Sequence, residues 1–147
     1  MISAVEATSM ARDLVPVLGA MDLRVVAVGE GTATVEIPAQ PNLNHAGVVY
    51  AGSLFSLAEV LGGIIPLVTF DLPGFVPLVR DVQIRFVRPA RGAVRATADL
   101  APDEVTRVHD VARENGKAEF VLDTELRSED GTVVATTRAV YQMSRMV

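Results

Sequence analysis

Glu59 is the residue of this chain that is best suited to chemistry, because it is a single carboxylate within an almost uncharged stretch, Ser53 to Ile65. If that stretch is helical, Phe55 and Gly63 lie one turn away on either side, and neither side chain can solvate a charge. An unpaired charge in such surroundings is costly, so the pKa of the carboxyl group should move from its usual range. Carboxyl groups with displaced pKa values carry out general acid–base chemistry, which makes Glu59 a candidate catalytic residue.

A polar turn that contains glycines leads straight into this predicted helix. It reads Asn-His-Ala-Gly-Val-Val-Tyr-Ala-Gly from Asn44 to Gly52. The first amides of a helix have no acceptor inside the helix, and the helix dipole favours negative charge beside them. A turn, a helix start and a buried acid therefore fall within sixteen residues, Asn44 to Glu59, which is a plausible active site.

The elements that must position this site alternate in a simple order. Hydrophobic spacing predicts an amphipathic helix from Glu6 to Gly19 and a second, inserted helix from Pro102 to Asn115. Alternating polar and apolar residues bounded by turn residues predict six strands. Their ranges are Leu23 to Val28, Thr32 to Ile37, Leu78 to Val87, Ala93 to Leu100, Ala118 to Arg127 and Thr132 to Met143. The last four strands are expected to form a mostly antiparallel meander, in which Ala93 to Leu100 pairs back onto Leu78 to Val87.

Together these elements predict one α+β domain over residues 1–147, with an N-terminal helix in 1–20 and the sheet and central helix in 21–147. Half of the residues are hydrophobic and five percent are aromatic, so the core should consist mostly of Val, Leu, Ile and Ala. An antiparallel sheet of five to six strands, wrapped around one long central helix, would bury that helix on all sides. Sheet edges or faces that stay uncovered should pack against a second copy, so we expect at least a dimer.

Composition and missing motifs exclude several classes of function. The chain has no cysteine and only two histidines, so no metal-ligand set is expected. A net charge of −5 argues against nucleic acid as a partner. The Gly-x-Ser-x-Gly elbow, the P-loop and the Gly-x-Gly-x-x-Gly fingerprint are absent. The apolar window from Ser53 to Phe70 contains a carboxylate, two glycines and a proline, which favours a buried core helix over a membrane span. Without a secretory signal, a cytoplasmic protein is expected.

Three motifs in this order resemble those of the hotdog-fold thioesterases, in particular the phenylacetic-acid-degradation-type acyl-CoA thioesterases. The motifs are Asn44-His-Ala-Gly47, the segment from Gly52 to Leu57-Ala58-Glu59, and Phe86-Val-Arg-Pro-Ala-Arg-Gly92. The resemblance extends from about Leu23 to Tyr141. It implies a hotdog fold and a homodimer or homotetramer that hydrolyses the thioester of an acyl-CoA or acyl carrier, without metal or cofactor.

The resemblance also implies roles for individual residues. Glu59 stands where the family places its general base or nucleophile, and Asn44 where an asparagine positions water or the thioester carbonyl across the subunit interface. The amide of Ala51 falls at the family's oxyanion contact, where unsatisfied helix amides favour a developing negative charge. The substrate-binding positions that the resemblance implies are Gly47, Tyr50, Gly52 and Val79. His45 is not part of the usual motif, but as a loop histidine near the site it is a further candidate for binding the ligand.

Three of these positions depart from the family pattern. Tyr50 replaces the histidine and Ala51 the first glycine of a His-Gly-Gly motif, and Val79 replaces a serine or threonine that helps to orient water. The acid and the amide remain, but supporting groups are lost. A non-catalytic acyl-CoA-binding or structural protein is therefore one alternative. Dehydration of a hydroxyacyl thioester, in which His45 would act with the acid, is another.

Each candidate feature also has a purely structural interpretation. Glu59 could be satisfied by backbone amides or by Arg80 or Arg85, and Asn44 could simply form an Asx turn. Gly62 and Gly63 favour close packing of the helix. The four arginines Arg80, Arg85, Arg88 and Arg91 could contact the phosphates of coenzyme A, although solvated side chains are the favoured interpretation.

Overall fold

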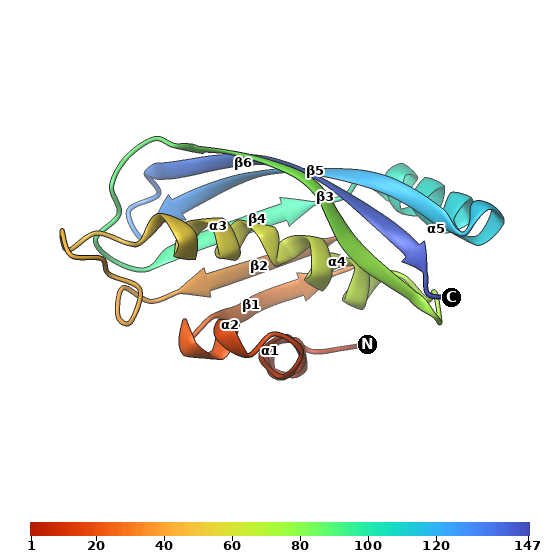
Figure 1. The fold of residues 1–147 in the computed structure, drawn as a ribbon, viewed down its shortest axis with the longest axis horizontal. Helices are drawn as coiled ribbons and strands as arrows, with labels where there is room; N and C mark the ends of the chain where they lie inside the picture. Colours follow the sequence, from red (N-terminus) through yellow and green to blue (C-terminus); the bar gives the residue numbers. More distant parts are fainter.

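A computed structural model describes all residues from 1 to 147 as a six-stranded antiparallel sheet curled around a central helix (Figure 1). The helices are α1 Ala4–Leu14, α2 Pro16–Ala20, α3 Ala51–Glu59, α4 Leu61–Thr69 and α5 Pro102–Asn115. The strands are β1 Arg24–Gly29, β2 Thr32–Ile37, β3 Phe75–Phe86, β4 Val94–Asp99, β5 Lys117–Ser128 and β6 Val133–Arg145. The predicted α+β architecture, with a sheet wrapped around one helical segment, is thus confirmed.

The order of the strands across the sheet is β1-β2-β4-β5-β6-β3. The expected pairing of residues 93–100 with residues 78–87 is wrong, because β4 pairs with β2 and β5, whereas β3 pairs with β6 at the edge. Alternation shows which face of a strand is buried, but it does not identify the neighbouring strand. Small residues explain this pairing: Ala98 of β4 lies opposite Ala33 of β2, and Ala96 lies opposite Val35. All four are buried, and their small size makes room for the central helix.

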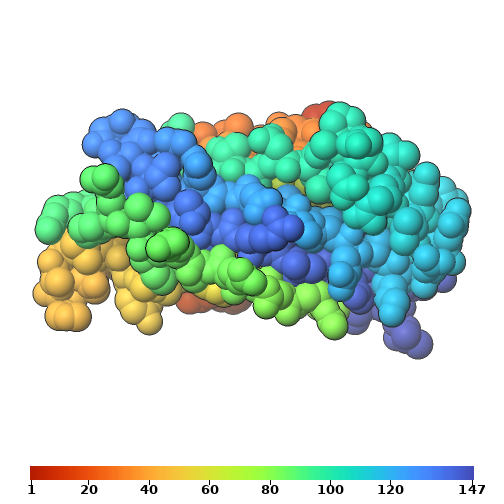
Figure 2. Space-filling view, turned by 90° about the horizontal axis from the view of Figure 1, so that it is seen from above, coloured from red at the N-terminus to blue at the C-terminus, as the bar shows by residue number.

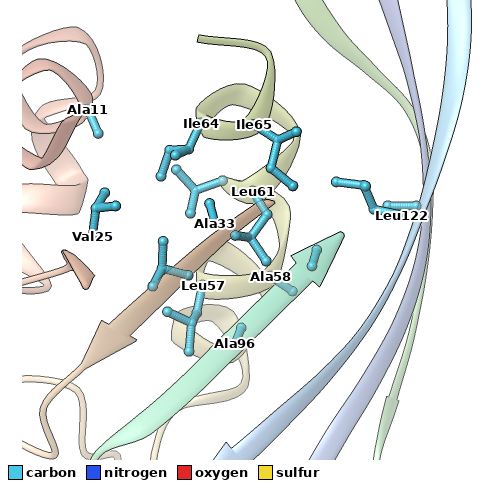
Figure 3. Close-up of a cluster of buried hydrophobic side chains, with 14 of the residues drawn as sticks. Ala11, Val25, Ala33, Leu57, Ala58, Leu61, Ile64, Ile65, Ala96 and Leu122 are labelled. Atoms are coloured by element: carbon cyan, nitrogen blue, oxygen red, sulfur yellow. The ribbon is translucent and has the colours of Figure 1, made fainter. Parts of the chain in front are cut away.

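The central helix is two helices, α3 and α4, joined at Val60. Figure 3 shows Leu57, Leu61 and Ile65 of this segment pointing into the core, with Leu122 of β5 across from Ile65. Ala51–Thr69 is long and apolar enough to cross a membrane by length and composition, but more than half of it is buried inside the sheet. It is therefore a core helix, as the sequence predicts.

The N-terminal segment forms two helices where one was expected, because Val15 leaves the helical conformation before Pro16. α1 begins with a capping box between Ser3 and Glu6. α5 matches its predicted range, and Gly116 ends it with a φ of 78°.

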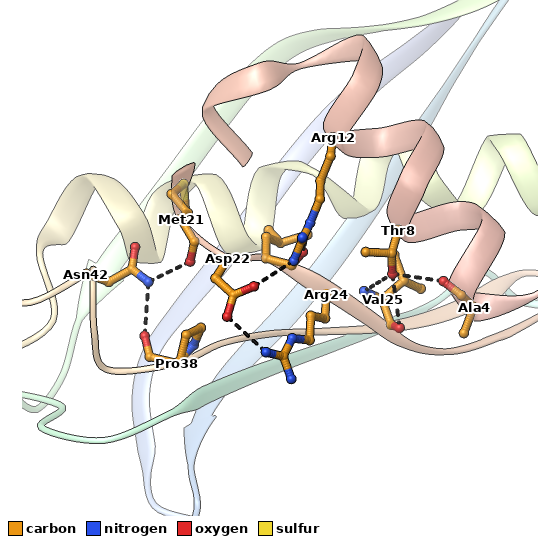
Figure 4. A network of polar contacts seen from close by, with 10 residues as sticks. Ala4, Thr8, Arg12, Met21, Asp22, Arg24, Val25, Pro38 and Asn42 are labelled. Atoms are coloured by element: carbon orange, nitrogen blue, oxygen red, sulfur yellow. Dashed lines mark hydrogen bonds and ion pairs between the residues drawn. The ribbon is translucent and has the colours of Figure 1, made fainter. Parts of the chain in front are cut away.

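α1 covers the β1 edge of the sheet through side chains that bond to its backbone (Figure 4). The Thr8 hydroxyl accepts the amide of Val25 at 2.9 Å and donates to the Ala4 carbonyl at 2.9 Å. Arg12 donates from Nε to the Leu23 carbonyl at 2.9 Å and forms an ion pair with Asp22 at 2.8 Å. The backbone groups that an edge strand leaves unpaired are thus partly satisfied within the chain.

β3 forms the opposite edge, and no helix lies against it in the same way. Figure 2 shows this strand running along one margin of the molecule beside β6. A register irregularity interrupts its pairing with β6 between Val79 and Asp81. Leu78 and Phe86 of this strand are exposed although they are large and apolar.

Candidate active site

Glu59 is the last residue of α3, and its side chain is half-buried. The carboxylate forms neither an ion pair nor a side-chain hydrogen bond, so Arg80 and Arg85 do not satisfy it. Burial alone raises the pKa of Glu59. A carboxyl group that is partly removed from water and has no cation beside it accepts a proton more readily than an exposed one, which suits it to act as a general base.

A break in the helix directly after Glu59 frees its backbone carbonyl. The amide of Gly63 donates to Val60 at 2.9 Å, one residue short of the regular helical acceptor at Glu59. The hydroxyl of Tyr141 donates to the Glu59 carbonyl instead, at 2.9 Å. Burial, and after it the charge of Glu59, raises the pKa of Tyr141, so this hydroxyl stays protonated and can donate. Tyr141 on β6 thereby holds the helix open at the candidate catalytic residue.

Gly62 explains how Tyr141 reaches this carbonyl. A Cβ atom at Gly62 would lie 1.9 Å from Cε1 of Tyr141, so only glycine leaves room for the ring. The ring is also stacked on Phe120, with centroids 5.4 Å apart. Sequence reasoning missed Tyr141 because it follows Glu59 by 82 residues; the one available signal was a tyrosine on the buried face of a strand. The packing interpretation is correct for Gly62, but a Cβ at Gly63 would meet nothing within 4 Å.

The turn before α3 is a tight hairpin in which Leu43 pairs with Val49. Oδ1 of Asn44 accepts the amides of Ala46 at 2.9 Å and Val48 at 3.3 Å. The Asx-turn interpretation is therefore right for the side-chain oxygen of Asn44. Its Nδ2 group forms no hydrogen bond within the chain, so this NH₂ is what Asn44 can offer to a ligand.

His45 and Gly47 lie exposed at the tip of this hairpin. Gly47 has a φ of +73°, a conformation that glycine adopts without strain.

A second asparagine, Asn42, anchors the hairpin, and sequence reasoning missed it. Its side chain is buried, and Nδ2 donates to the carbonyls of Met21 at 2.8 Å and Pro38 at 3.0 Å (Figure 4). Its backbone carbonyl accepts the amide of Tyr50 at 2.8 Å. Asn42 therefore ties Tyr50, which directly precedes α3, to the residues that directly follow α2 and β2. The Asn-x-Asn spacing was the only signal for it.

The start of α3 leaves two amides without acceptors. Ser53 and Leu54 both donate to the carbonyl of Tyr50, whereas the amides of Ala51 and Gly52 have no partner within the chain. Ala51 is exposed, and the Tyr50 ring lies so close to Gly52 that a Cβ there would be 2.4 Å from Cε2. Free amides at a helix N-terminus are suited to bind an oxyanion.

One chain does not bring all of these groups to one point. Ala51 and Glu59 are eight residues apart on a helix, which corresponds to about 12 Å along its axis. A glutamate side chain and one hydrogen bond cannot span that length. Val79 lies on β3, with 47% of its surface exposed at the open edge. No group of three His, Cys, Asp or Glu side chains that could hold a metal ion occurs.

Comparison with known proteins agrees with this architecture. No curated protein matches the chain. A solved structure from Pseudomonas aeruginosa, described as a protein of unknown function and probable thioesterase, is 36% identical over 95% of this chain and 94% of that one, with a TM-score of 0.88.

Two further solved structures share the fold at lower identity. A thioesterase from Haemophilus influenzae is 16% identical over 100% of this chain and 97% of its own, with a TM-score of 0.77. A mutant thioesterase from Pseudomonas aeruginosa is 17% identical over 95% of this chain and 94% of its own, with a TM-score of 0.74. The structure thus has the hotdog fold of thioesterases. Residues 5–143 match the family described as a domain of unknown function, DUF4442, and the chain belongs to that family.

Proposed function

We propose that this protein is a thioesterase that hydrolyses acyl-CoA or acyl-carrier thioesters with Glu59 as the acidic catalytic residue. The observation that carries the proposal is a half-buried carboxylate with no cation and no hydrogen bond, on a helix that begins with two unpaired amides. The chain's 36% identity to a protein described as a probable thioesterase supports the same reaction class. We place the activity in the cytoplasm.

The proposed site is shared between two copies of the chain. Because the Ala51 amide and the Glu59 carboxylate of one chain are too far apart for one carbonyl group, the amide must face the carboxylate of a partner. Large apolar side chains are exposed near the helix start and along β3, and pairing at the β3 edge would cover them. They are Tyr50, Phe55, Leu78, Val79, Phe86 and Val87. This interface favours a homodimer, and two such dimers could form a tetramer.

In the first route, Glu59 takes a proton from water, and the resulting hydroxide attacks the thioester carbonyl carbon. The Ala51 amide and the Asn44 NH₂ of the partner stabilise the oxygen anion that forms. The C–S bond then breaks, and the protonated Glu59 returns its proton to the departing thiolate. The products are a carboxylic acid and a free thiol.

In a second route, Glu59 attacks the carbonyl carbon itself and expels the thiolate, which leaves a mixed anhydride that water hydrolyses. Heavy oxygen found in the Glu59 carboxyl group after single-turnover hydrolysis in heavy-oxygen water identifies this second route. It enters there only when water attacks the side-chain carbonyl carbon of Glu59 in the anhydride.

A specific observation also favours the alternative of an acyl-CoA-binding protein without turnover. The side-chain oxygen of Asn44 is occupied by its own turn, and Tyr50 stands in place of the family's histidine. Dehydration would require His45, which lies exposed at the tip of the hairpin.

The proposal is tested by measuring thiol release from a panel of acyl-CoA thioesters. The variant is Glu59→Gln, and the control is Glu30→Gln, which lies in the exposed turn between β1 and β2. Loss of the general base should lower kcat about 10²–10⁴-fold, while Glu30→Gln should behave as wild type. Binding without turnover by the wild type would favour the non-catalytic alternative. Turnover that survives in Glu59→Gln would refute the assignment of Glu59.

A further inference from the structure

An apolar cavity of about 510 Å³ lies between the N-terminal helices and α4, next to the candidate active site. Ala11, Leu14 and Leu18 line it from α1 and α2, and Gly63, Ile64 and Leu67 line it from α4. Figure 3 shows Ala11 of α1 and Ile64 of α4 on facing sides of these two helices. Its volume falls in the range of small-molecule sites, which are concave and mostly apolar.

The cavity adjoins the face of the central helix that carries Glu59. Residues four apart share a face, and Ala51, Phe55, Glu59, Gly63 and Leu67 follow this spacing. Each of them is exposed or half-exposed, whereas most residues between them are buried. Val60, which directly follows Glu59, also lines the cavity. An accessible stripe therefore leads from the helix start past the carboxylate into the cavity.

Gly63 has no packing requirement within the chain that would explain it. A Cβ atom at this position would meet nothing within 4 Å, in contrast to Gly62, whose place is taken by Tyr141. A glycine inside a helix is less stable than an alanine at the same position. Because it has no side chain, Gly63 keeps the cavity open one helical turn beyond the Glu59 carboxylate.

The lining side chains limit what the cavity can bind. They include no Lys, Arg or His, and their only charged member is Asp71, which lies exposed. Leu14 and Val15, which line the cavity, expose much of their apolar surface, so a hydrocarbon ligand that covers them would remove apolar surface from water. A second carboxylate on the ligand would find no cation and would be repelled by Asp71.

We propose that this cavity binds the hydrocarbon part of an unsubstituted aliphatic acyl group, with α1 and α2 forming its outer wall. The assignment rests on the proposed thioesterase function, since it places the thioester carbonyl at Glu59 and the chain beyond Gly63. It predicts that straight-chain acyl thioesters are preferred over acetyl, succinyl or malonyl thioesters.

The test is a series of acetyl-, butyryl-, hexanoyl-, decanoyl-, succinyl- and malonyl-CoA assayed with wild type, Gly63→Ala and Gly63→Leu. Leucine at position 63 should lower the decanoyl-to-butyryl ratio of kcat/KM about tenfold or more, because several methylene groups lose their place. Alanine should have a smaller effect. Ser9→Leu adds similar bulk to the exposed face of α1 and should leave the ratio unchanged.

Two results would overturn the proposal. One is a wild-type kcat/KM that does not rise with chain length. The other is a Gly63→Leu variant that changes all acyl-CoA substrates equally or changes the oligomeric state by light scattering, which would assign Gly63 to a partner contact.

Binding of 1-decanol, which has no charge that Glu59 or Asp71 would repel, distinguishes a wrong cavity from a wrong reaction and is measured by calorimetry. If no thioester is hydrolysed but decanol binds to wild type and about tenfold more weakly to Gly63→Leu, the cavity assignment holds while the proposed function fails. If the protein hydrolyses thioesters but does not bind decanol, the cavity assignment is wrong and the proposed function stands.

Discussion

The two edges of the sheet differ in how they are covered, because a helix of the same chain lies against β1 but not against β3. At β1, Thr8 and Arg12 of α1 bond directly to backbone groups of Val25 and Leu23. At β3, no such helix is present, and apolar side chains such as Leu78 and Phe86 stay exposed. An unpaired, apolar edge tends to pair with another strand. The difference shows which edge the chain closes by itself and which edge it leaves for a partner.

The largest expected effect comes from charging the open edge. Val79 of β3 and Val26 of β1 are comparable, because both are exposed valines on an edge strand, at 47% and 39%. Val79→Lys should convert the proposed dimer to monomers, because a lysine at the interface would lose its solvation without a partner. Since the proposed site needs both chains, kcat should fall about 10²–10³-fold. Light scattering and thiol-release assays check both results.

The matched variant Val26→Lys should stay a dimer with wild-type activity, because α1 already closes that edge. If both variants behave alike, the two edges do not differ in the way proposed here.

A smaller effect is expected from opening the closed edge. Thr8→Val keeps the shape of the side chain but removes the hydroxyl that accepts the Val25 amide. The free energy of unfolding, measured with denaturant, should fall by about 1–2 kcal/mol, because a part-buried amide loses its partner. Thr106→Val on exposed α5 removes a hydroxyl that bonds only within its own helix, and it should cost less. Equal losses in the two variants would argue against edge closure by Thr8.

Tyr141 of β6 lies one strand in from the open edge. Tyr141→Phe keeps the stacked ring but removes the donor to the Glu59 carbonyl. We expect a loss of about 1 kcal/mol in stability, together with a fall in kcat that exceeds any change in KM, because Glu59 is no longer held in position.

The chain's only other tyrosine, Tyr50, is exposed and forms no side-chain hydrogen bond, so Tyr50→Phe should keep wild-type stability. A Tyr141→Phe enzyme with normal kcat would restrict this hydroxyl to a structural role.

The smallest effect is expected on the free energy of unfolding, which is lowered because Glu59 must be ionised in a half-buried position. Its pKa is raised by burial in the folded chain. As pH rises from the ordinary glutamate pKa towards this raised value, the unfolded state loses its proton first, and the folded state loses stability. Glu59→Gln should therefore be more stable than wild type at neutral pH, and the difference should shrink in acid. Denaturation at a series of pH values measures it. A variant that is less stable at neutral pH would contradict the cost assigned to this carboxylate.

Much of the local structure could be predicted from the sequence, because it depends on short-range patterns. The range of α5, the strand ranges to within a few residues, and the core role of the apolar helix all follow from periodicity and turn residues. The same holds for Glu59, which is conspicuous as the one charge in an apolar helix, and for the helix start with its free amides. The Asx turn is one of the two interpretations that the sequence allows for Asn44, because asparagine forms this turn with its own neighbours.

The rest depended on contacts between distant segments, which no local pattern contains. Residues far apart in the chain decide which strand lies beside β3 and why position 62 must be glycine. They also decide that Tyr141 donates to the Glu59 carbonyl. The same is true of the apolar cavity beside Gly63. Backbone preferences and hydrophobic periodicity act over a few residues, so the order of residues is enough to show where helices, strands and a reactive carboxylate can form. Which of these elements come into contact depends on packing, because packing joins segments regardless of their separation along the chain.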